Sequence, residues 1–281
     1  MRTFLDCYPC FLNQALRAGR LATDDETQIK RLLDEVGGML KTIPIESSPA
    51  ETGRLIYRKV SEITANPDPY RQVKERNIHK ALGLYPGLKK IVAQSDDPLL
   101  TALRIAIAGN VIDLGAPGEF DIEKEIEDVL EKPFAISDYK IFKDHLQHAR
   151  SVLYLADNAA ECVFDRILIE EMKKPVTFVV RERPVINDAT REDALKAGLG
   201  ELSTVVSSGT DAPGTVLETC CREFKELFYR SEFIISKGQG NYEALSGQQR
   251  PIFFMLKAKC SVVAADLGVA VGDIILKDIN A

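Results

Sequence analysis

The stretch Ser151-Val152-Leu153-Tyr154-Leu155-Ala156-Asp157-Asn158-Ala159-Ala160-Glu161 decides the fold. Five of its first six residues are apolar or aromatic, which is typical of a central strand in a parallel sheet. Apolar residues then recur at helical spacing over 160–168, which predicts a helix directly after the strand. Asp157 and Asn158 fall at the carboxyl end of the strand, where open parallel sheets bind ligands. The pair either caps the helix or holds a hard cation such as Mg²⁺ or Mn²⁺.

Residues 149–281 show an alternation of strands and helices, which predicts an α/β domain with a mainly parallel sheet. After the opening strand, apolar runs predict strands near 175–180, 202–206, 233–236 and 251–256. Helices are expected from about residue 191 and over 216–228. Two apolar segments, 262–264 and 274–276, close the chain.

Residues 1–148 predict a mostly helical N-terminal region without a strand. Ser48-Pro49 begins one helix, because serine caps helices and proline is tolerated in the first turn. Tyr85-Pro86-Gly87 is expected to interrupt another helix, which begins near Tyr70. A strongly apolar helix then leads into Asn110 and Asp113, which either satisfy its last carbonyl groups or contact a ligand.

Polar residues follow each of the first four predicted strands, and parallel strands bring such loops to one edge of the sheet. The four segments are Asp157-Asn158, Asn187-Asp188, 207–214 and 237–243. Two carboxylates and an amide from neighbouring strands can hold an oxygen-loving divalent ion. Lys237, with the backbone N–H groups of Gly238 and Gly240, can form an anion site that faces this ion. A metal, a lysine and polar loops together favour phosphoryl chemistry.

Several other site motifs are absent from the sequence. Asp157-Asn158-Ala159-Ala160 stands where a dinucleotide fold would have G-x-G-x-x-G, and neither a G-x-x-x-x-G-K-[ST] phosphate loop nor a G-x-S-x-G nucleophile elbow occurs. Cys7-Tyr8-Pro9-Cys10 has the spacing of half a zinc site or of a redox pair. No second C-x-x-C supplies the remaining zinc ligands.

Composition narrows the class of protein further. The formal net charge of −6 over 281 residues argues against general binding of nucleic acid, which rests on neutralisation of phosphates by Lys and Arg. No apolar run approaches the ~20 residues of a membrane span, and the N-terminus lacks the apolar segment of a signal peptide. We therefore expect a cytoplasmic protein whose partner is a small molecule, with its six cysteines as thiols or metal ligands.

Three stretches together resemble the metal-dependent damage-control phosphatase family, whose ARMT-like domain was long known as a domain of unknown function. They are 155–161, 181–188 and 237–243, in this order behind a helical half. The resemblance spans nearly the whole chain and indicates a stand-alone microbial member. It implies an α/β fold in which a helical N-terminal region packs on a Rossmann-like α/β/α sandwich with a mainly parallel sheet.

The resemblance also implies an activity, the hydrolysis of phosphate monoesters on small metabolites such as sugar phosphates or damaged phosphometabolites. It implies that Asp157, Asn158 and Asp188 bind a divalent metal (Mg²⁺, Mn²⁺, Co²⁺ or Ni²⁺) and that Lys237 acts near the phosphate. Four further residues are expected either to contact the phosphate or to support the metal ligands: Glu161, Arg181, Asn187 and Asn241.

Two other functions stay open at this point. A carboxyl methyltransferase, a role attached to part of this family, normally has an acidic, glycine-rich loop after its first strand for the methyl-donor nucleoside, and this chain lacks that loop. The second open function is that of a non-enzymatic module that binds a metal or metabolite through Cys7 and Cys10. Metal-dependent turnover of p-nitrophenyl phosphate would separate a phosphatase from both.

Overall fold

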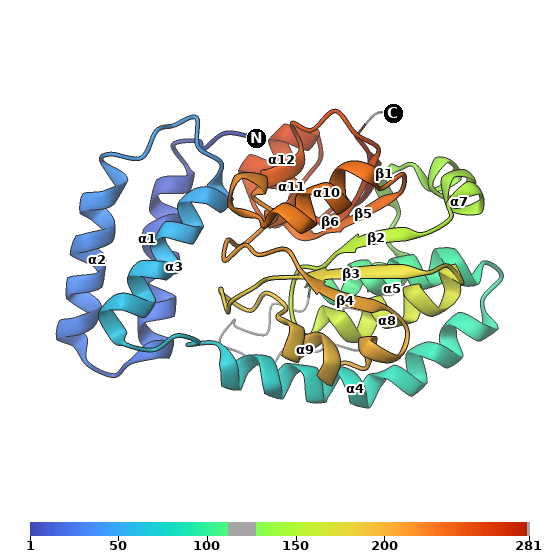
Figure 1. Cartoon of the computed structure of the whole chain (residues 1–281), viewed down its shortest axis with the longest axis horizontal. Coiled ribbons are helices and arrows are strands. Elements are labelled where there is room, and N and C mark those ends of the chain that lie inside the picture. The colour runs from blue at the N-terminus through green and yellow to red at the C-terminus, as the bar shows by residue number, and fades with distance from the viewer. Residues whose placement is uncertain (112–127, 280–281) are drawn as a thin grey trace.

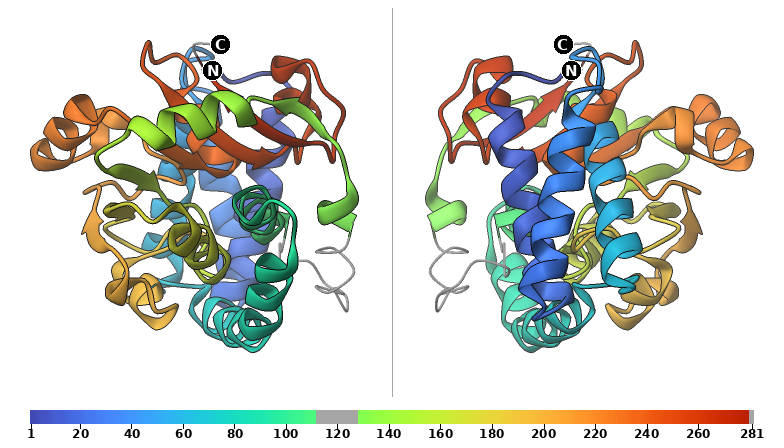
Figure 2. Two further views of the ribbon diagram at one scale, coloured as in Figure 1. Left: turned by 90° about the vertical axis from the view of Figure 1, so that its right-hand side faces the viewer. Right: turned by 90° about the vertical axis from the view of Figure 1, so that its left-hand side faces the viewer.

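The computed structural model describes residues 1–111 and 128–279, without the side chains of residues 110 and 111. The chain begins with three helices that lie side by side at one end of the molecule (Figures 1 and 2). Their apolar faces pack on one another around Phe11, Leu32 and Ile56. The three are α1 (Cys7–Ala22), α2 (Glu26–Leu40) and α3 (Pro49–Thr64).

Helix α3 begins where the sequence predicts. Ser48 and Glu51 form a capping box, in which each side chain accepts a hydrogen bond from the backbone N–H of the other residue. Pro49 occupies the first turn, where a backbone N–H has no partner within the helix, so proline costs no helical hydrogen bond there.

Helix α4 (Arg71–Gln94) differs from the prediction, because it runs without interruption through Pro86. Its apolar residues on both sides of this proline, Ala81 and Leu88 among them, are buried in the main core. Packing of a long buried face can outweigh the one hydrogen bond that a proline removes. The predicted break at residues 85–87 is therefore wrong.

In the part of the chain that the structure describes, seven strands form one sheet, in the order β1-β7-β6-β5-β2-β3-β4. All neighbouring strands are parallel except β6 and β7. From β2 the chain proceeds outward to β3 and β4, and from β5 it proceeds in the opposite direction. Ligands bind at such switch points, at the carboxyl ends of the strands. The bounds are β1 Phe134–Ser137, β2 Val152–Leu155, β3 Val176–Val180, β4 Thr204–Ser207, β5 Ile234–Lys237, β6 Ile252–Lys257 and β7 Ile274–Asp278.

Helices cover both faces of the sheet (Figure 1). On one face, α4, α5 (Pro98–Val111), α7 (Tyr139–His148) and α8 (Glu161–Met172) bury apolar strand residues such as Tyr154. On the other, α10 (Arg222–Arg230), α11 (Gly238–Leu245) and α12 (Ser261–Leu267) bury Leu155. Helix α9 (Arg191–Lys196) follows β3. The predicted α/β class, a mainly parallel sheet between helices, is confirmed.

Three further parts of the chain differ from the prediction. Strand β1 lies in the region expected to have no strand; it is only four residues long and half buried, too short to leave a clear pattern. The polar segment after β5 is helix α11 rather than a loop. Its two glycines are poor helix formers, so the sequence pattern does not indicate a helix there. The helix expected over 216–228 is a short 3-10 turn, Leu217–Thr219, followed by α10. Of the two last apolar segments, the first lies in α12 and the second in β7.

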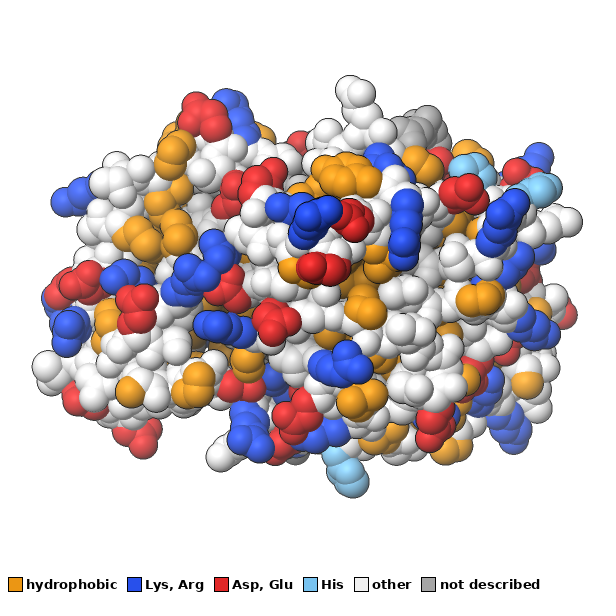
Figure 3. Space-filling view, in the orientation of Figure 1, with side chains coloured by type: hydrophobic (Ala, Val, Ile, Leu, Met, Phe, Trp, Pro, Cys, Tyr) orange, Lys and Arg blue, Asp and Glu red, His pale blue; other side chains and the backbone are white. Residues whose placement is uncertain are grey.

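Within residues 1–111 and 128–279, no helix combines the length and the apolar character needed to cross a bilayer. On the face seen in Figure 3, acidic and basic side chains are interspersed rather than gathered in one patch. The feature of the fold that bears on function is therefore the carboxyl edge of the sheet.

Lys74 on α4 is 3% exposed, and its ammonium lies 3.1 Å from Asp193 on α9 and 3.0 Å from Asp68. Lys74→Met should lower the free energy of unfolding by about 3–5 kcal/mol, because it leaves the buried carboxylate of Asp193 without its cation. Lys196→Met is the matched control, since Lys196 joins the same two helices through Glu75 on the exposed surface, and it should cost far less. Urea denaturation measures both, and equal losses would contradict the prediction.

Candidate functional site

A cavity of about 250 Å³ lies at the carboxyl edge of the sheet. Helices α1 and α3 form one wall, and the segments that follow strands β2 to β6 form the other. Helix α1 contributes Cys7, Cys10 and Gln14 to the lining. The cavity therefore joins residues from opposite ends of the chain at the switch point of the sheet.

The three predicted metal ligands lie together in the wall of this cavity. Asp157 and Asn158 directly follow β2, and Asp188 belongs to the loop after β3. Backbone hydrogen bonds join the two loops: the Ala189 N–H donates to the carbonyl oxygen of Asp157 at 2.8 Å, and Asn158 pairs with Asp188 in an isolated antiparallel bridge. The backbone thus fixes the spacing of the two carboxylates and the amide.

Helix α8 offers no support for the capping interpretation of Asp157 and Asn158. The helix begins at Glu161, its N-cap residue is Ala160, and no side chain makes a cap hydrogen bond. The amide nitrogen Nδ2 of Asn158 instead donates to the carboxylates of Asp157 and Glu161. Both residues are therefore available for a role in the cavity.

Buried negative charge dominates the electrostatics of the site. Burial raises the pKa of Asp157 well above its usual value, and the carboxylates of Glu161 and Asp188 raise it further. Burial also raises the pKa of Asp188, although the guanidinium of Arg181 acts in the opposite direction. A bound cation would offset this cost. The described residues contain no group of three or more His, Cys, Asp and Glu placed to hold a metal ion, so a metal site here depends on the amide oxygen of Asn158.

Arg181 lies behind the cavity and holds Asp188. Its buried guanidinium donates to Asp188 Oδ2 at 2.8 Å, to Thr215 Oγ1 at 3.1 Å and to Asn241 Oδ1 at 3.1 Å. Asn241 in turn donates to the carbonyl oxygen of Ala156 at 3.0 Å. These bonds join the loops after four strands, so Arg181 and Asn241 support the cavity wall without lining it.

Lys237 is fully buried and does not line the cavity. Its ammonium donates to Asp165 Oδ1 at 2.6 Å, to the carbonyl oxygen of Ala106 at 2.8 Å and to Glu161 Oε2 at 3.2 Å. Burial alone would lower the pKa of Lys237, but the two carboxylates outweigh this and raise it. An ammonium has three N–H donors, and each has a protein partner here. This arrangement does not support the predicted contact between Lys237 and a phosphate, and that contact stays a prediction.

Gly238 and Gly240 have a steric reason to be glycines. Gly238 has a φ of +79°, and a Cβ on it would overlap the carboxylate of Asp157. A Cβ on Gly240 would overlap the carbonyl oxygen of Pro213. The two glycines let α11 begin beside Asp157, and Gly240 in its first turn lines the cavity.

The predicted site residues fall into two groups. Those that line the cavity are Asp157, Asn158, Asn187, Asp188 and Gly240. Those that lie outside its lining are Glu161, Arg181, Lys237, Gly238 and Asn241. Asp113 and the side chain of Asn110 lie outside the described residues.

Lys259 is a cavity residue that the sequence pattern did not single out. It follows β6, is exposed and lines the cavity, and its positive charge counteracts the rise in the pKa of Asp157. Among the described residues its ammonium has no ion-pair partner. Lys259 follows the fifth predicted strand, and the rule that polar residues gather at the carboxyl ends of parallel strands applies to it as well.

The cysteines of the C-x-x-C motif also face this cavity, together with Cys260. All six cysteines are free thiols. Burial raises the pKa of Cys7, which keeps its thiol protonated at neutral pH. The motif occupies the first turn of α1. It lines the same cavity as Asp157 and Asp188 because α1 covers the carboxyl edge of the sheet.

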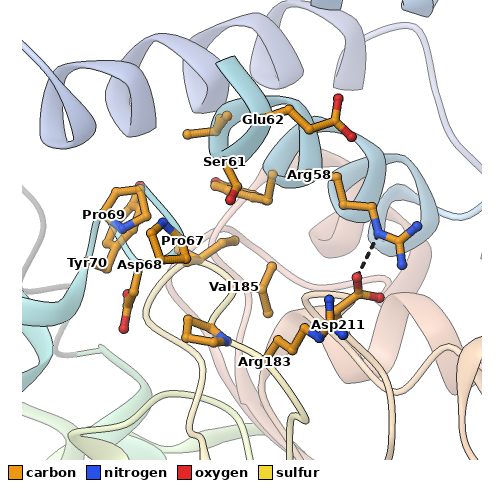
Figure 4. A pocket seen from close by; sticks show the side chains of 14 residues that line it. Arg58, Ser61, Glu62, Pro67, Asp68, Pro69, Tyr70, Arg183, Val185 and Asp211 are labelled. Carbon is orange, nitrogen blue, oxygen red and sulfur yellow. Dashed lines mark hydrogen bonds and ion pairs between the residues drawn. The ribbon is translucent and has the colours of Figure 1, made fainter. Parts of the chain in front are cut away.

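A larger cavity, of about 590 Å³, lies beside the loop that carries Asp188 (Figure 4). Pro67 and Val185 line it, and Arg58 pairs with Asp211 at 2.7 Å on its wall. Ile186 lines both cavities. Because the larger one contains none of the predicted metal ligands, the smaller cavity is the candidate active site.

Known proteins resemble this chain over nearly its whole length. A model of the damage-control phosphatase ARMT1-like domain matches residues 3–275. A damage-control phosphatase from Archaeoglobus fulgidus is 37% identical, over 96% of this chain and 97% of its own. A damage-control phosphatase from Pyrococcus horikoshii is 36% identical, over 98% and 97%. The crystal structure of a DUF89 family protein from Pyrococcus horikoshii matches with a TM-score of 0.92 and 34% identity, over 99% of each chain.

The contact between Gly238 and Asp157 predicts a stability effect. Gly238→Ala should lower the free energy of unfolding by at least about 1–2 kcal/mol, because an alanine at positive φ is strained and its Cβ would also displace the Asp157 carboxylate. Gly247→Ala is the control, since a Cβ there meets nothing within 4 Å, and it should be neutral or slightly stabilising. Urea denaturation of the two variants tests this, and equal stability would refute it.

Proposed function

The chain belongs to the damage-control phosphatase ARMT1-like domain family, and from this membership we propose that it hydrolyses phosphate monoesters of small metabolites with the help of a divalent metal ion. The proposed substrates are sugar phosphates or damaged phosphometabolites. One observation supports this most strongly: a single cavity unites Asp157, Asn158 and Asp188 with the ammonium of Lys259. Oxygen donors on one side and a cation on the other suit a metal and a phosphate bound together.

The residues present fit a hard divalent metal. Asp157, Asn158 and Asp188 would hold it, and their oxygens are the donors that Mg²⁺ and Mn²⁺ prefer, while Co²⁺ and Ni²⁺ are further candidates. The raised pKa of Asp157, caused first by burial, also favours a cation beside it. Such an ion, when bound, withdraws charge from a phosphoryl oxygen. Arg181 donates to Asp188 Oδ2 alone, so the carboxylate is held in orientation by one of its two oxygens.

The phosphate would be bound by Lys259 and by the N-terminus of α11. Lys259 supplies a positive charge without an ion-pair partner among the described residues, and the N–H groups of Gly238 and Gly240 belong to the first turn of the helix. Helix N-termini bind anions through such N–H groups and through the helix dipole. Together they would stabilise the negative charge on the phosphoryl oxygens as the ester bond breaks.

Asp157→Asn tests the proposed metal ligand, because it removes one charge while keeping the size of the side chain. Turnover of p-nitrophenyl phosphate with Mn²⁺ should fall by more than about 100-fold, since even residues behind metal ligands contribute about 10–100-fold. Because burial raises the pKa of Asp157, the folded, metal-free protein binds this proton more tightly than the unfolded chain does. At a pH above the usual pKa of an aspartate, the ionised Asp157 carboxylate therefore lowers the free energy of unfolding. The metal-free variant should therefore melt at or above the temperature of the wild type.

Asp188→Asn tests the second proposed carboxylate ligand. It should lose turnover in the same way, and the melting temperature of the metal-free protein should change little, because relief of the buried charge and loss of the ion pair with Arg181 act in opposite directions. Exhaustive chelation should abolish the turnover of the wild type, and Mn²⁺ should restore it. Asp157→Asn protein that keeps its turnover at low Mn²⁺ concentration would show that Asp157 is not a ligand.

Lys259→Met tests the phosphate contact. It should lower kcat/KM for p-nitrophenyl phosphate by about 10–100-fold, because a hydrogen bond to a charged group contributes about 1.5–3 kcal/mol and 1.4 kcal/mol is tenfold. Mn²⁺ affinity should stay unchanged or rise, since the variant removes a cation that faces Asp157. Lys90→Met, on the exposed surface of α4, is the control for loss of charge and should have wild-type kinetics. An unchanged kcat/KM in Lys259→Met would move the phosphate site elsewhere.

A further inference from the structure

A buried chain of polar side chains runs beneath the proposed metal site. Glu161, Asp165 and Lys237 are each 1% exposed or less. Glu161 and Asp165 stand one turn apart on α8, so both carboxylates lie on the helix face that meets the end of β5. None of the three lines the cavity, and none has a part in the chemistry proposed above.

Glu161 connects this buried chain to Asn158 through its two oxygens. Oε2 accepts a hydrogen bond from the ammonium of Lys237 at 3.2 Å. Oε1 accepts a hydrogen bond from the amide nitrogen Nδ2 of Asn158. The same nitrogen also donates to Asp157 Oδ2, at 3.2 Å. Both N–H bonds of the Asn158 amide are therefore directed at carboxylates.

These contacts leave the amide of Asn158 one favourable orientation. A turned amide would place its oxygen against the carboxylates of Asp157 and Glu161, which have no proton to donate when ionised. With Nδ2 held by the two carboxylates, the oxygen of the planar amide points away from Glu161. The acceptor oxygen is the atom of Asn158 that a hard metal ion can bind.

We propose that Glu161 is a positioning residue that directs the amide oxygen of Asn158 at the metal, and that Lys237 holds Glu161 in place rather than binding the phosphate. The inference rests on the proposed function. Lys237 pairs with both Glu161 and Asp165, and its third hydrogen bond, to Ala106 on α5, fixes the ammonium to the neighbouring helix. Residues behind metal ligands orient those ligands and are worth about 10–100-fold in metal affinity.

Glu161→Gln is the decisive variant, because glutamine offers one acceptor and one donor where glutamate offers two acceptors. The oxygen of the new side chain must face the ammonium of Lys237, so its nitrogen faces the Nδ2 of Asn158. Two donors then oppose each other, and the amide of Asn158 turns its oxygen away from the metal. The Mn²⁺ dissociation constant, measured on folded metal-free protein by electron paramagnetic resonance, should rise by about 10–100-fold.

A double variant, Glu161→Gln with Asn158→Asp, supplies a test that a merely structural role would not pass. The exchange keeps the total charge and restores one donor opposite one acceptor, with the direction of the hydrogen bond reversed. Mn²⁺ affinity should recover to within about 10-fold of the wild type. A double variant that binds Mn²⁺ no better than Glu161→Gln alone would overturn the proposal.

Lys237→Met and Tyr154→Phe complete the comparison. Lys237→Met should weaken Mn²⁺ binding in the same range as Glu161→Gln; if it does not fold, Glu161→Gln and the double variant decide. Tyr154→Phe is the matched control, because Tyr154 belongs to the same buried chain but donates its hydrogen bond to Asp165 Oδ1, at 2.7 Å, rather than to Glu161, and it should keep wild-type affinity. If Lys237→Met keeps Mn²⁺ affinity but loses binding of inorganic phosphate, Lys237 contacts the phosphate and the proposal is wrong.

The outcome for Asp157→Asn distinguishes this inference from the proposed function. If the wild type binds no Mn²⁺, or if Asp157→Asn binds it equally well, the metal site itself is misplaced and both ideas fail. If Asp157→Asn abolishes Mn²⁺ binding while Glu161→Gln leaves it within threefold of the wild type, the metal site stands and only the positioning role of Glu161 is refuted.

Discussion

Buried negative charge at the carboxyl edge of the sheet is the constraint on which the site depends. Four acidic side chains there are 8% exposed or less: Asp157, Glu161, Asp165 and Asp188. Because a buried charge is costly unless it is paired, each needs a cation or a proton. Arg181 pairs with Asp188, and the single ammonium of Lys237 is shared by Glu161 and Asp165. Burial raises the pKa of Asp157 well above its usual value, and a bound metal ion would offset the cost of ionising this carboxyl.

The topology of the sheet creates this concentration of charge and also supports it. Strands β2 and β5 are neighbours although the chain visits two other strands between them. Gly238 therefore meets Asp157 in backbone-to-side-chain contact, and Asn241 bonds to loops from three strands. Helices α1 and α3 then cover the same edge and turn an open crevice into a cavity. The helical region thus lines the cavity opposite the acidic residues of the sheet edge.

The sequence located the strands and the loops with acidic residues, because buried parallel strands are continuous apolar runs and each ends at a polar residue. It failed where tertiary packing outweighs local preference: α4 continues through Pro86, and α11 contains two glycines in its first turn. Strand β1 is half buried at the edge of the sheet and leaves no run to detect. The predicted ligands Asp157 and Asp188 share one cavity because the alternation of strands and helices, which a sequence displays, indicates parallel strands whose carboxyl ends meet at one edge of the sheet.

The direction in which a lysine points is a property that the sequence pattern does not contain. Lys237 ends β5 and Lys259 follows β6, so position alone makes both equally good candidates for an anion site. Their surroundings differ because the partners of Lys237 come from distant parts of the chain, Asp165 and the carbonyl oxygen of Ala106. A lysine whose three N–H groups are bound by protein oxygens cannot give one to a substrate without breaking a buried hydrogen bond, and two of the three bonds of Lys237 are also ion pairs. The lysine that remains exposed in the cavity is therefore the one that can bind a phosphate at small cost.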